Sequence, residues 1–136
     1  MKVRFALLAD FSNVTLEGKI NILGVFDVLH SSVFPVRHLE MQFVMRFEAD
    51  ISERGQQKDV QVRLINERGQ PILEVNGHIM VGDPKPGDFL FFNQVLTLRN
   101  VVFPSAGNYQ FDIYIDGTLQ SVWPLKVVGP PATHKA

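Results

Sequence analysis

Two side chains in one alternating segment have the types and spacing of metal ligands. His38 and Glu40 stand two residues apart, and Gln42 continues the row. Because successive side chains of a strand point to opposite faces, these residues are predicted to share a face. With a third ligand from a neighbouring strand they would hold a divalent ion, as in a metal-dependent enzyme. The same row is also typical of a solvated polar face, and we expect that arrangement, with no metal bound.

A second acidic pair lies in one loop. Asp83 and Asp88 belong to segment 82–88, whose two prolines and two glycines exclude helix and strand. Calcium-dependent C2 domains place several aspartates in such loops, because Ca²⁺ takes roughly 6–8 oxygen ligands. Here only two acids are present, and Lys85 lies between them. We therefore expect a rigid surface loop, stiffened by its prolines, and no calcium.

The other chemistry-bearing residues do not form a recognisable catalytic motif. Ser31 and Ser32 follow His30, but neighbours in an extended chain point to opposite faces. The sequence has no Gly-x-Ser-x-Gly, no phosphate-binding glycine motif and no cysteine. Glycoside hydrolysis needs two carboxylates that face each other, and which carboxylates do so depends on the fold. We expect no enzyme activity and no cofactor.

Aromatic residues are in surplus, with eleven phenylalanines, two tyrosines and one tryptophan. Alternation puts Phe91 and Tyr114 on the faces opposite to their apolar neighbours, and Trp123 precedes a proline near a predicted sheet edge. A cluster of these three side chains would form an interaction surface, unless loops or the tail cover them. Together with Tyr109, Tyr114 and Trp123 are also candidates for stacking against a sugar.

Composition excludes several classes of partner. The 136 residues carry a formal net charge of -1, from 13 basic and 14 acidic residues, whereas phosphate binding usually needs a basic excess. No apolar run approaches the roughly 20 residues that span a bilayer. Residues 5–9 are shorter than the roughly 7–15-residue apolar core of a signal peptide. We expect no nucleic acid partner, no membrane partner and a cytoplasmic location, which the lack of cysteine favours.

Alternation of apolar and polar residues with period two runs through most of the chain. In segment 39–49 every odd residue from Leu39 to Ala49 is apolar and the even residues are polar, except Val44. This pattern predicts a strand with its odd residues in a core. Further strands are predicted at 2–9, 19–29, 59–65, 71–81, 89–98, 109–115 and about 118–128.

These strands predict an all-β fold. About eight strands at hairpin-like spacing indicate a single antiparallel β-sandwich, immunoglobulin-like or C2-like, with a small β-barrel as the alternative. We expect the domain to cover 1–128 and a flexible tail to cover 129–136. Gly24 predicts a bulge or a close backbone approach, and Asp116-Gly117 predicts a two-residue turn with both φ angles positive.

One segment has the pattern of a structural corner. In 103–111, Pro104 and Gly107 form a turn, Tyr109 opens an alternating strand, and Phe111 follows two residues later. This resembles the tyrosine corner of immunoglobulin-like sandwiches, in which the tyrosine hydroxyl bonds back to the preceding backbone. The motif concerns architecture and not activity.

Three short segments, spread over most of the domain, carry a wider resemblance. They are Ala-Asp-Phe at 9–11 after a short strand, Gly-Lys-Ile-Asn-Ile-Leu-Gly at 18–24, and the stretch 107–117 from Gly-Asn-Tyr to Asp-Gly. In these the chain resembles a family of small bacterial domains without an assigned function. The resemblance implies a cytoplasmic bacterial β-sandwich and supplies no catalytic residues to transfer.

The sequence therefore favours a non-enzymatic interaction or structural domain. We expect it to self-associate through a sheet face or an edge strand, or to be a subunit of a larger bacterial assembly. One alternative is a small-ligand or carbohydrate-binding module that uses exposed aromatic residues. The other is a metal-dependent enzyme that uses His38 and Glu40.

Overall fold

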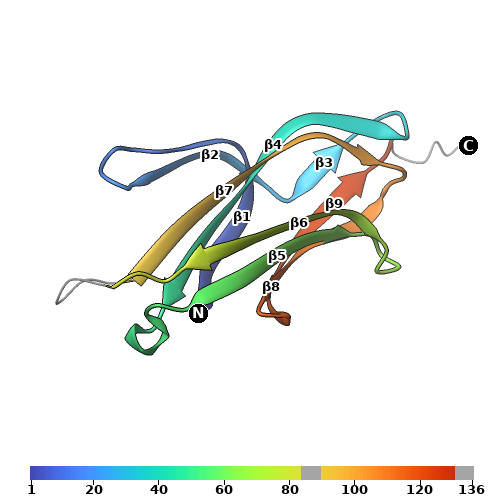
Figure 1. The fold of residues 1–136 in the computed structure, drawn as a ribbon. Coiled ribbons are helices and arrows are strands. Elements are labelled where there is room, and N and C mark those ends of the chain that lie inside the picture. The colour runs from blue at the N-terminus through green and yellow to red at the C-terminus, as the bar shows by residue number, and fades with distance from the viewer. Residues whose placement is uncertain (84–89, 131–136) are drawn as a thin grey trace, which may run out of the picture.

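The computed structural model describes residues 1–83 and 90–130, and Figure 1 shows their fold. In this part of the chain nine strands and one 3-10 turn, η1 (Ile51–Glu53), are formed. The strands are β1 (Lys2–Val14), β2 (Ile20–Phe26), β3 (Val28–His30), β4 (Val36–Ala49), β5 (Gln57–Ile65), β6 (Pro71–Met80), β7 (Leu90–Phe103), β8 (Gly107–Ile115) and β9 (Thr118–Val128). The all-β prediction is confirmed.

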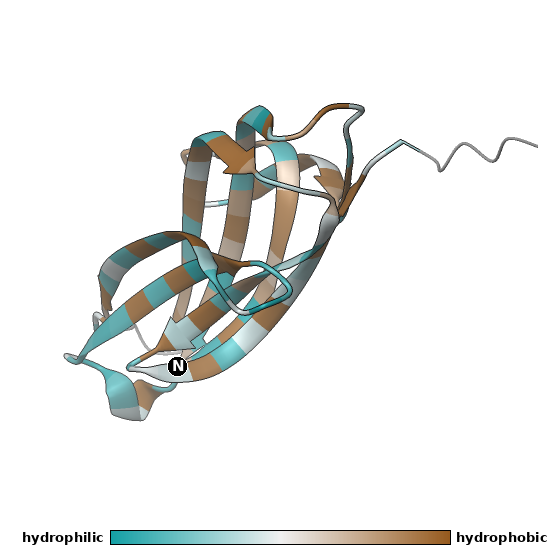
Figure 2. Ribbon diagram, turned by 90° about the vertical axis from the view of Figure 1, so that its right-hand side faces the viewer, coloured by the Kyte–Doolittle hydropathy of each residue, from teal (hydrophilic) through white to brown (hydrophobic). Residues whose placement is uncertain are grey.

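The strands form two sheets around one core. Sheet A has the order β2-β1-β4-β7, and sheet B has the order β3-β9-β8-β5-β6. Phe43 of β4 and Phe111 of β8 are both fully buried and stack across the two sheets, with 4.6 Å between ring centroids. Figure 2 shows the alternation of apolar and polar residues along the strands that lets each sheet turn one face inward.

The prediction for segment 39–49 is confirmed at five positions and wrong at one. Met41, Phe43, Met45 and Phe47 are almost fully buried, and Ala49 is also buried, whereas Leu39 is 73% exposed. The reason lies in the β4–β7 ladder.

Opposite Leu39, Asn100 of β7 has a positive φ of 55°. Before Asn100 the buried residue of β7 is the even-numbered Leu98. After Asn100 the buried residues are the odd-numbered Val101 and Phe103. The ladder thus turns its other face to the core, and Leu39 is left outside.

Val44 breaks the alternation of β4 because sheet A has a second covered surface. Val44 and Ala9 of β1 are fully buried, yet both lie outside the main core. The Ser12 hydroxyl of β1 donates to Gln42 Oε1 of β4. Asn93 Nδ2 of β7 donates to the carbonyl oxygen of Gly18, in the turn between β1 and β2, at 3.3 Å.

That last hydrogen bond links the β1–β2 turn at one edge of sheet A to β7 at the other edge. Sheet A is therefore curled, and the β1–β2 hairpin folds across the outer side of β4. This curl explains why an apolar residue is needed at a position that alternation assigns to water.

The predicted strand 19–29 is not continuous. It divides at Asp27 into β2, which pairs with β1, and β3, which belongs to sheet B. Lys126 donates its backbone N–H to the Asp27 carbonyl oxygen at 2.8 Å, and β3 then runs parallel to β9. The prediction of a purely antiparallel fold is therefore wrong at this pair, because the chain changes sheets after a hairpin.

Two local predictions are confirmed. A Cβ atom on Gly24, which has a φ of 71°, would lie 2.5 Å from Asp10 Oδ2, so this glycine does mark a close approach. Asp116 and Gly117 both have positive φ, as the two-residue turn requires. Most of the predicted loop 82–88 and of the predicted tail 129–136 lies outside the described residues.

Candidate functional site

The three aromatic residues predicted to form an interaction surface lie apart. Phe91 of β7 belongs to sheet A, with the Arg46 guanidinium carbon 4.4 Å from its ring centroid. Tyr114 of β8 belongs to sheet B, where Arg63 lies 6.0 Å from its ring centroid. Trp123 of β9 stands opposite Phe111 and packs against the core. These side chains do not combine into one surface.

The corner residues have a structural role. The Tyr109 hydroxyl donates to the Ser105 carbonyl oxygen at 2.7 Å, and the buried Tyr109 ring packs edge-on to Phe103 at 5.0 Å. Pro104 is exposed in the same turn. Gly107 has a φ of 153°, and a Cβ atom there would lie 2.8 Å from Glu67 Oε1. The hydrogen bond expected of a tyrosine corner is therefore present.

A polar depression of about 330 Å³ lies beside this corner, between the β5–β6 and β7–β8 turns. Its acidic residue is Glu67, whose Oε1 accepts a hydrogen bond from the Asn108 backbone N–H at 2.6 Å. Asn66 Oδ1 accepts from the backbone N–H groups of Arg68 and Gln70, each at 2.9 Å. The Glu67 bond therefore joins the two turns, and the Asn66 bonds close the β5–β6 turn.

His38 and Glu40 lie in different surroundings. The His38 ring lies 6.1 Å from the Phe26 ring, and its Nε2 is buried without a hydrogen-bond partner among the described residues. Glu40 instead accepts a hydrogen bond from Arg99 Nε at 3.1 Å. Within residues 1–83 and 90–130, no three His, Asp or Glu side chains gather as metal ligands. Of the acidic loop pair, Asp88 lies outside the described residues.

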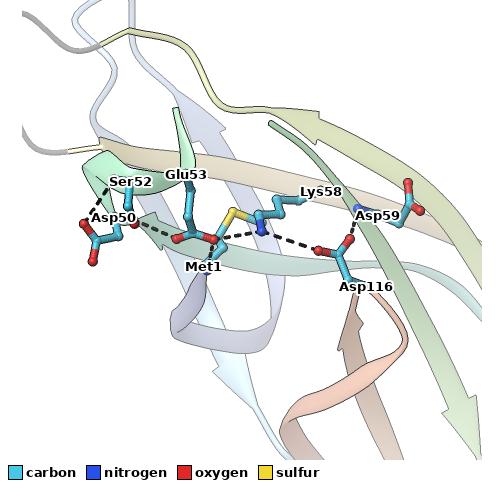
Figure 3. Close-up of polar contacts among 7 residues, drawn as sticks. All are labelled: Met1, Asp50, Ser52, Glu53, Lys58, Asp59 and Asp116. Carbon is cyan, nitrogen blue, oxygen red and sulfur yellow. Dashed lines mark hydrogen bonds and ion pairs between the residues drawn. The ribbon is translucent and has the colours of Figure 1, made fainter. Parts of the chain in front are cut away.

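An ion-paired cluster joins η1 to sheet B at the opposite end from the corner (Figure 3). Glu53 contacts the Met1 amine and lies 3.0 Å from Lys58 Nζ, which is also 3.5 Å from Asp116 Oδ2. Asp116 Oδ1 in turn accepts the Asp59 backbone N–H at 2.9 Å. The cluster therefore fixes η1 and the β8–β9 turn against the start of β5.

The same contacts set the charge of the cluster. The Asp50 backbone N–H donates to Glu53 Oε1 at 2.9 Å. This bond, followed by that from the Met1 amine and assisted by Lys58, lowers the pKa of Glu53 to about 2, against the effect of burial. Glu53 in turn raises the pKa of Lys58. Both groups stay ionised at neutral pH, so neither is poised to exchange protons there.

A shallow hollow of about 420 Å³ lies on the outer face of sheet B. Tyr114 lines it together with the polar side chains of Gln61, Asn76 and His78. An aromatic ring beside amide and imidazole groups can stack against and hydrogen-bond to a small polar molecule. Of the predicted stacking residues, Tyr114 lines this hollow on the outer face of sheet B, whereas Tyr109 lines the depression at the corner and is buried.

Several exposed apolar side chains that the sequence did not single out lie on the β1–β2 hairpin. We define the hairpin surface as the five apolar residues of the β1–β2 hairpin that are about half exposed or more. They are Phe11, Val14, Leu16, Leu23 and Val25. Phe11 and Leu23 are directly opposite each other in the ladder. An exposed apolar cluster of this kind marks an interaction site more often than scattered single residues do.

A signal for this surface is present in β2. Its sequence Ile-Asn-Ile-Leu-Gly-Val-Phe is apolar at nearly every position. Such a strand needs cover on both faces. The curl of sheet A covers the face that carries Ser12, Val14 and Ile20. Phe11, Leu23 and Val25 lie on the other face, which remains exposed, Leu16 lies in the turn, and Val14 is exposed at the rim of the covered face.

The edge strands differ in how they are protected. Each sheet has two edges, which are β2 and β7 in sheet A and β3 and β6 in sheet B. β3 has three residues, β6 carries Pro71 and Glu74, and β7 carries Arg99. Short length, proline and charge all discourage pairing with another chain. β2 has seven residues with none of these features.

The described part of the chain has no helix with the length and apolar character needed to cross a bilayer. Fold and side-chain geometry together define a two-sheet all-β domain with an exposed apolar hairpin. The chain belongs to the family DUF6941, a family of unknown function, whose match covers residues 4–128. A comparison with curated proteins gives no match.

Proposed function

We propose that this protein is a non-enzymatic interaction domain that self-associates, or joins a larger bacterial assembly, through the hairpin surface. The observation that carries the proposal is the coincidence, on one hairpin, of five exposed apolar residues and the least protected edge strand. Association buries apolar area, and an open strand edge supplies backbone hydrogen bonds to a partner.

The non-enzymatic part of the proposal is supported by what the polar clusters do. Glu67, Glu53 and Lys58 are each held in contacts that join segments of the fold. The immunoglobulin-like identity is also part of the proposal, supported by the Tyr109–Ser105 hydrogen bond of the corner. A bacterial cytoplasmic setting completes it, supported by the family resemblance and by a sequence without cysteine.

Site-specific photo-cross-linking in the host cell tests the proposal. A photoreactive residue at position 23 should give covalent protein adducts, because Leu23 lies at the centre of the hairpin surface. The matched control is position 119, an exposed leucine on β9 of sheet B. We expect several-fold more adduct from position 23. Equal or absent adducts at the two positions would overturn the proposed use of the hairpin.

The hollow around Tyr114 supports a second candidate function, the binding of a small polar ligand such as a sugar. Its test is titration of the labelled protein with a panel of mono- and oligosaccharides, followed by NMR. The expected result is a set of chemical-shift changes confined to Gln61, Asn76, His78 and Tyr114, and lost in Tyr114→Ala. A spectrum unchanged at millimolar saccharide removes this candidate.

A further inference from the structure

Resting on the proposed use of the hairpin surface, we infer that its occupant is a second copy of this chain, joined by antiparallel pairing of β2 with β2 of the partner. The two copies would be related by a two-fold axis through Leu23. Antiparallel pairing of identical strands is self-complementary, so it closes after two copies. The joined structure would be a continuous sheet of two curled sheets A.

The edge itself favours strand addition. Among the described strands, β2 has a neighbour on one side only, β1. No side chain of β2 is charged, and none is proline, so the edge carries no built-in repulsion toward a second strand. Natural monomers usually place a charge or a proline on an edge of this length, and β2 has neither. Its one backbone irregularity is Gly24, with a φ of 71°.

Charge at the two ends of β2 selects the antiparallel arrangement and its register. Leu23 is the midpoint of Ile20–Phe26. Pairing about Leu23 places Lys19, just before β2, opposite Asp27 of the second copy, and the symmetry repeats this pair at the other end. Both residues are exposed in the single chain. A parallel arrangement would instead bring Lys19 beside Lys19 and Asp27 beside Asp27.

The same register gathers the apolar side chains. Phe11 and Leu23 are opposite each other within one hairpin, so their side chains lie on the same face. Antiparallel pairing about Leu23 sets the two Leu23 side chains opposite each other on that face. The result is a row of four apolar residues, which are Phe11 and Leu23 of each copy. In this row Leu23 loses part of its 63% exposure.

Complementary charge reversal tests this pairing in the full-length protein. Lys19→Glu puts two acidic residues together at both ends of the interface, and Asp27→Lys puts two lysines together. Sedimentation velocity from low micromolar to millimolar protein should show a wild-type dimer in rapid exchange, because strand-edge interfaces are small. Each single variant should raise the dimer dissociation constant at least about tenfold.

Two combinations of the variants restore opposite charges at the interface and make the test specific. The double variant Lys19→Glu/Asp27→Lys should recover dimerisation, and so should an equimolar mixture of the two single variants, since each end then pairs opposite charges. The control is Arg68→Glu, which reverses an exposed arginine of the β5–β6 turn and should leave the dissociation constant unchanged. A dimer indifferent to both reversals would overturn this pairing.

The outcome separates this inference from the function on which it rests. A chain that stays monomeric at millimolar concentration overturns self-pairing. If position 23 still gives adducts with a different protein in the cell, the interaction function stands with another partner. If position 23 gives no preferential adduct, both fail. An adduct with the mass of two chains supports both.

Discussion

The two ends of sheet B are fastened by different chemistry. At one end the β5–β6 and β7–β8 turns are joined by Glu67 to the Asn108 backbone, beside the buried Tyr109 hydroxyl. At the other end η1 and the β8–β9 turn are joined by Glu53 and Lys58. The first end combines one carboxylate with a special backbone shape and a buried ring, whereas the second is a network of opposite charges. The difference teaches that the second end makes a pH-dependent contribution to stability through the lowered pKa of Glu53.

The largest effect is expected from breaking the backbone shape of the corner end. Gly107→Ala adds a Cβ at a φ of 153°, 2.8 Å from the Glu67 carboxylate. The backbone strain should lower the free energy of unfolding by about 1–3 kcal/mol, by nearly the same amount at neutral and acidic pH. Urea denaturation measures it.

The matched control is Gly77→Ala in β6, where a Cβ meets nothing within 4 Å. It should be tolerated much better than Gly107→Ala. Equal stabilities of the two variants would show that the corner does not depend on Gly107.

Breaking the charged end should give a pH-dependent effect. The folded-state pKa of Glu53, about 2, is depressed, so its contribution is present above the ordinary carboxyl range and is lost as pH falls toward about 2. Glu53→Gln should cost about 1–2 kcal/mol at neutral pH, after allowance for solvent screening. Wild type and variant should converge near pH 2 in thermal unfolding.

Glu17→Gln is the control for that experiment, because Glu17 pairs with Lys19 on the exposed hairpin tip. It should change stability little at any pH. A constant difference between wild type and Glu53→Gln across the acidic range would contradict the assignment of the low pKa to folding.

The smallest effect tests the hydroxyl of the corner. Tyr109→Phe keeps the buried ring and its contact with Phe103 but removes the hydrogen bond to Ser105. We expect a loss of about 0.5–1.5 kcal/mol, with the fold intact and little change with pH. Tyr114→Phe on the outer face is the comparison variant. Identical unfolding curves for wild type and Tyr109→Phe would mean that the hydroxyl is solvated in solution.

Features set by a few neighbouring residues were predictable from the sequence. The core face of β4 between Met41 and Ala49 follows from alternation alone. The Asp116-Gly117 turn follows from two residues that tolerate positive φ, and the Tyr109 hydrogen bond follows from a corner of short sequence span. In each case the physical cause is local.

Features set by contacts between distant segments were not predictable. The change of sheet at Asp27 depends on β9, about a hundred residues away in the chain. The burial of Val44 depends on how sheet A curls, and the inward position of Trp123 depends on its pairing with Phe111. Alternation reports which residues share a face, but it does not report which element covers that face. The hairpin surface was missed for the same reason.

The central position of β9 has a mechanical consequence. β9 lies between β3 and β8, and its Val128 end is at the corner end of sheet B, whereas β1 starts near the ion-paired end. Figure 1 shows the first residue and the end of β9 at opposite ends of the molecule. Tension between the two would run along β9 and load the hydrogen bonds to both neighbours in shear, all together. A hairpin pulled open from its tip breaks one bond at a time, so this direction of pulling should meet more resistance than peeling would.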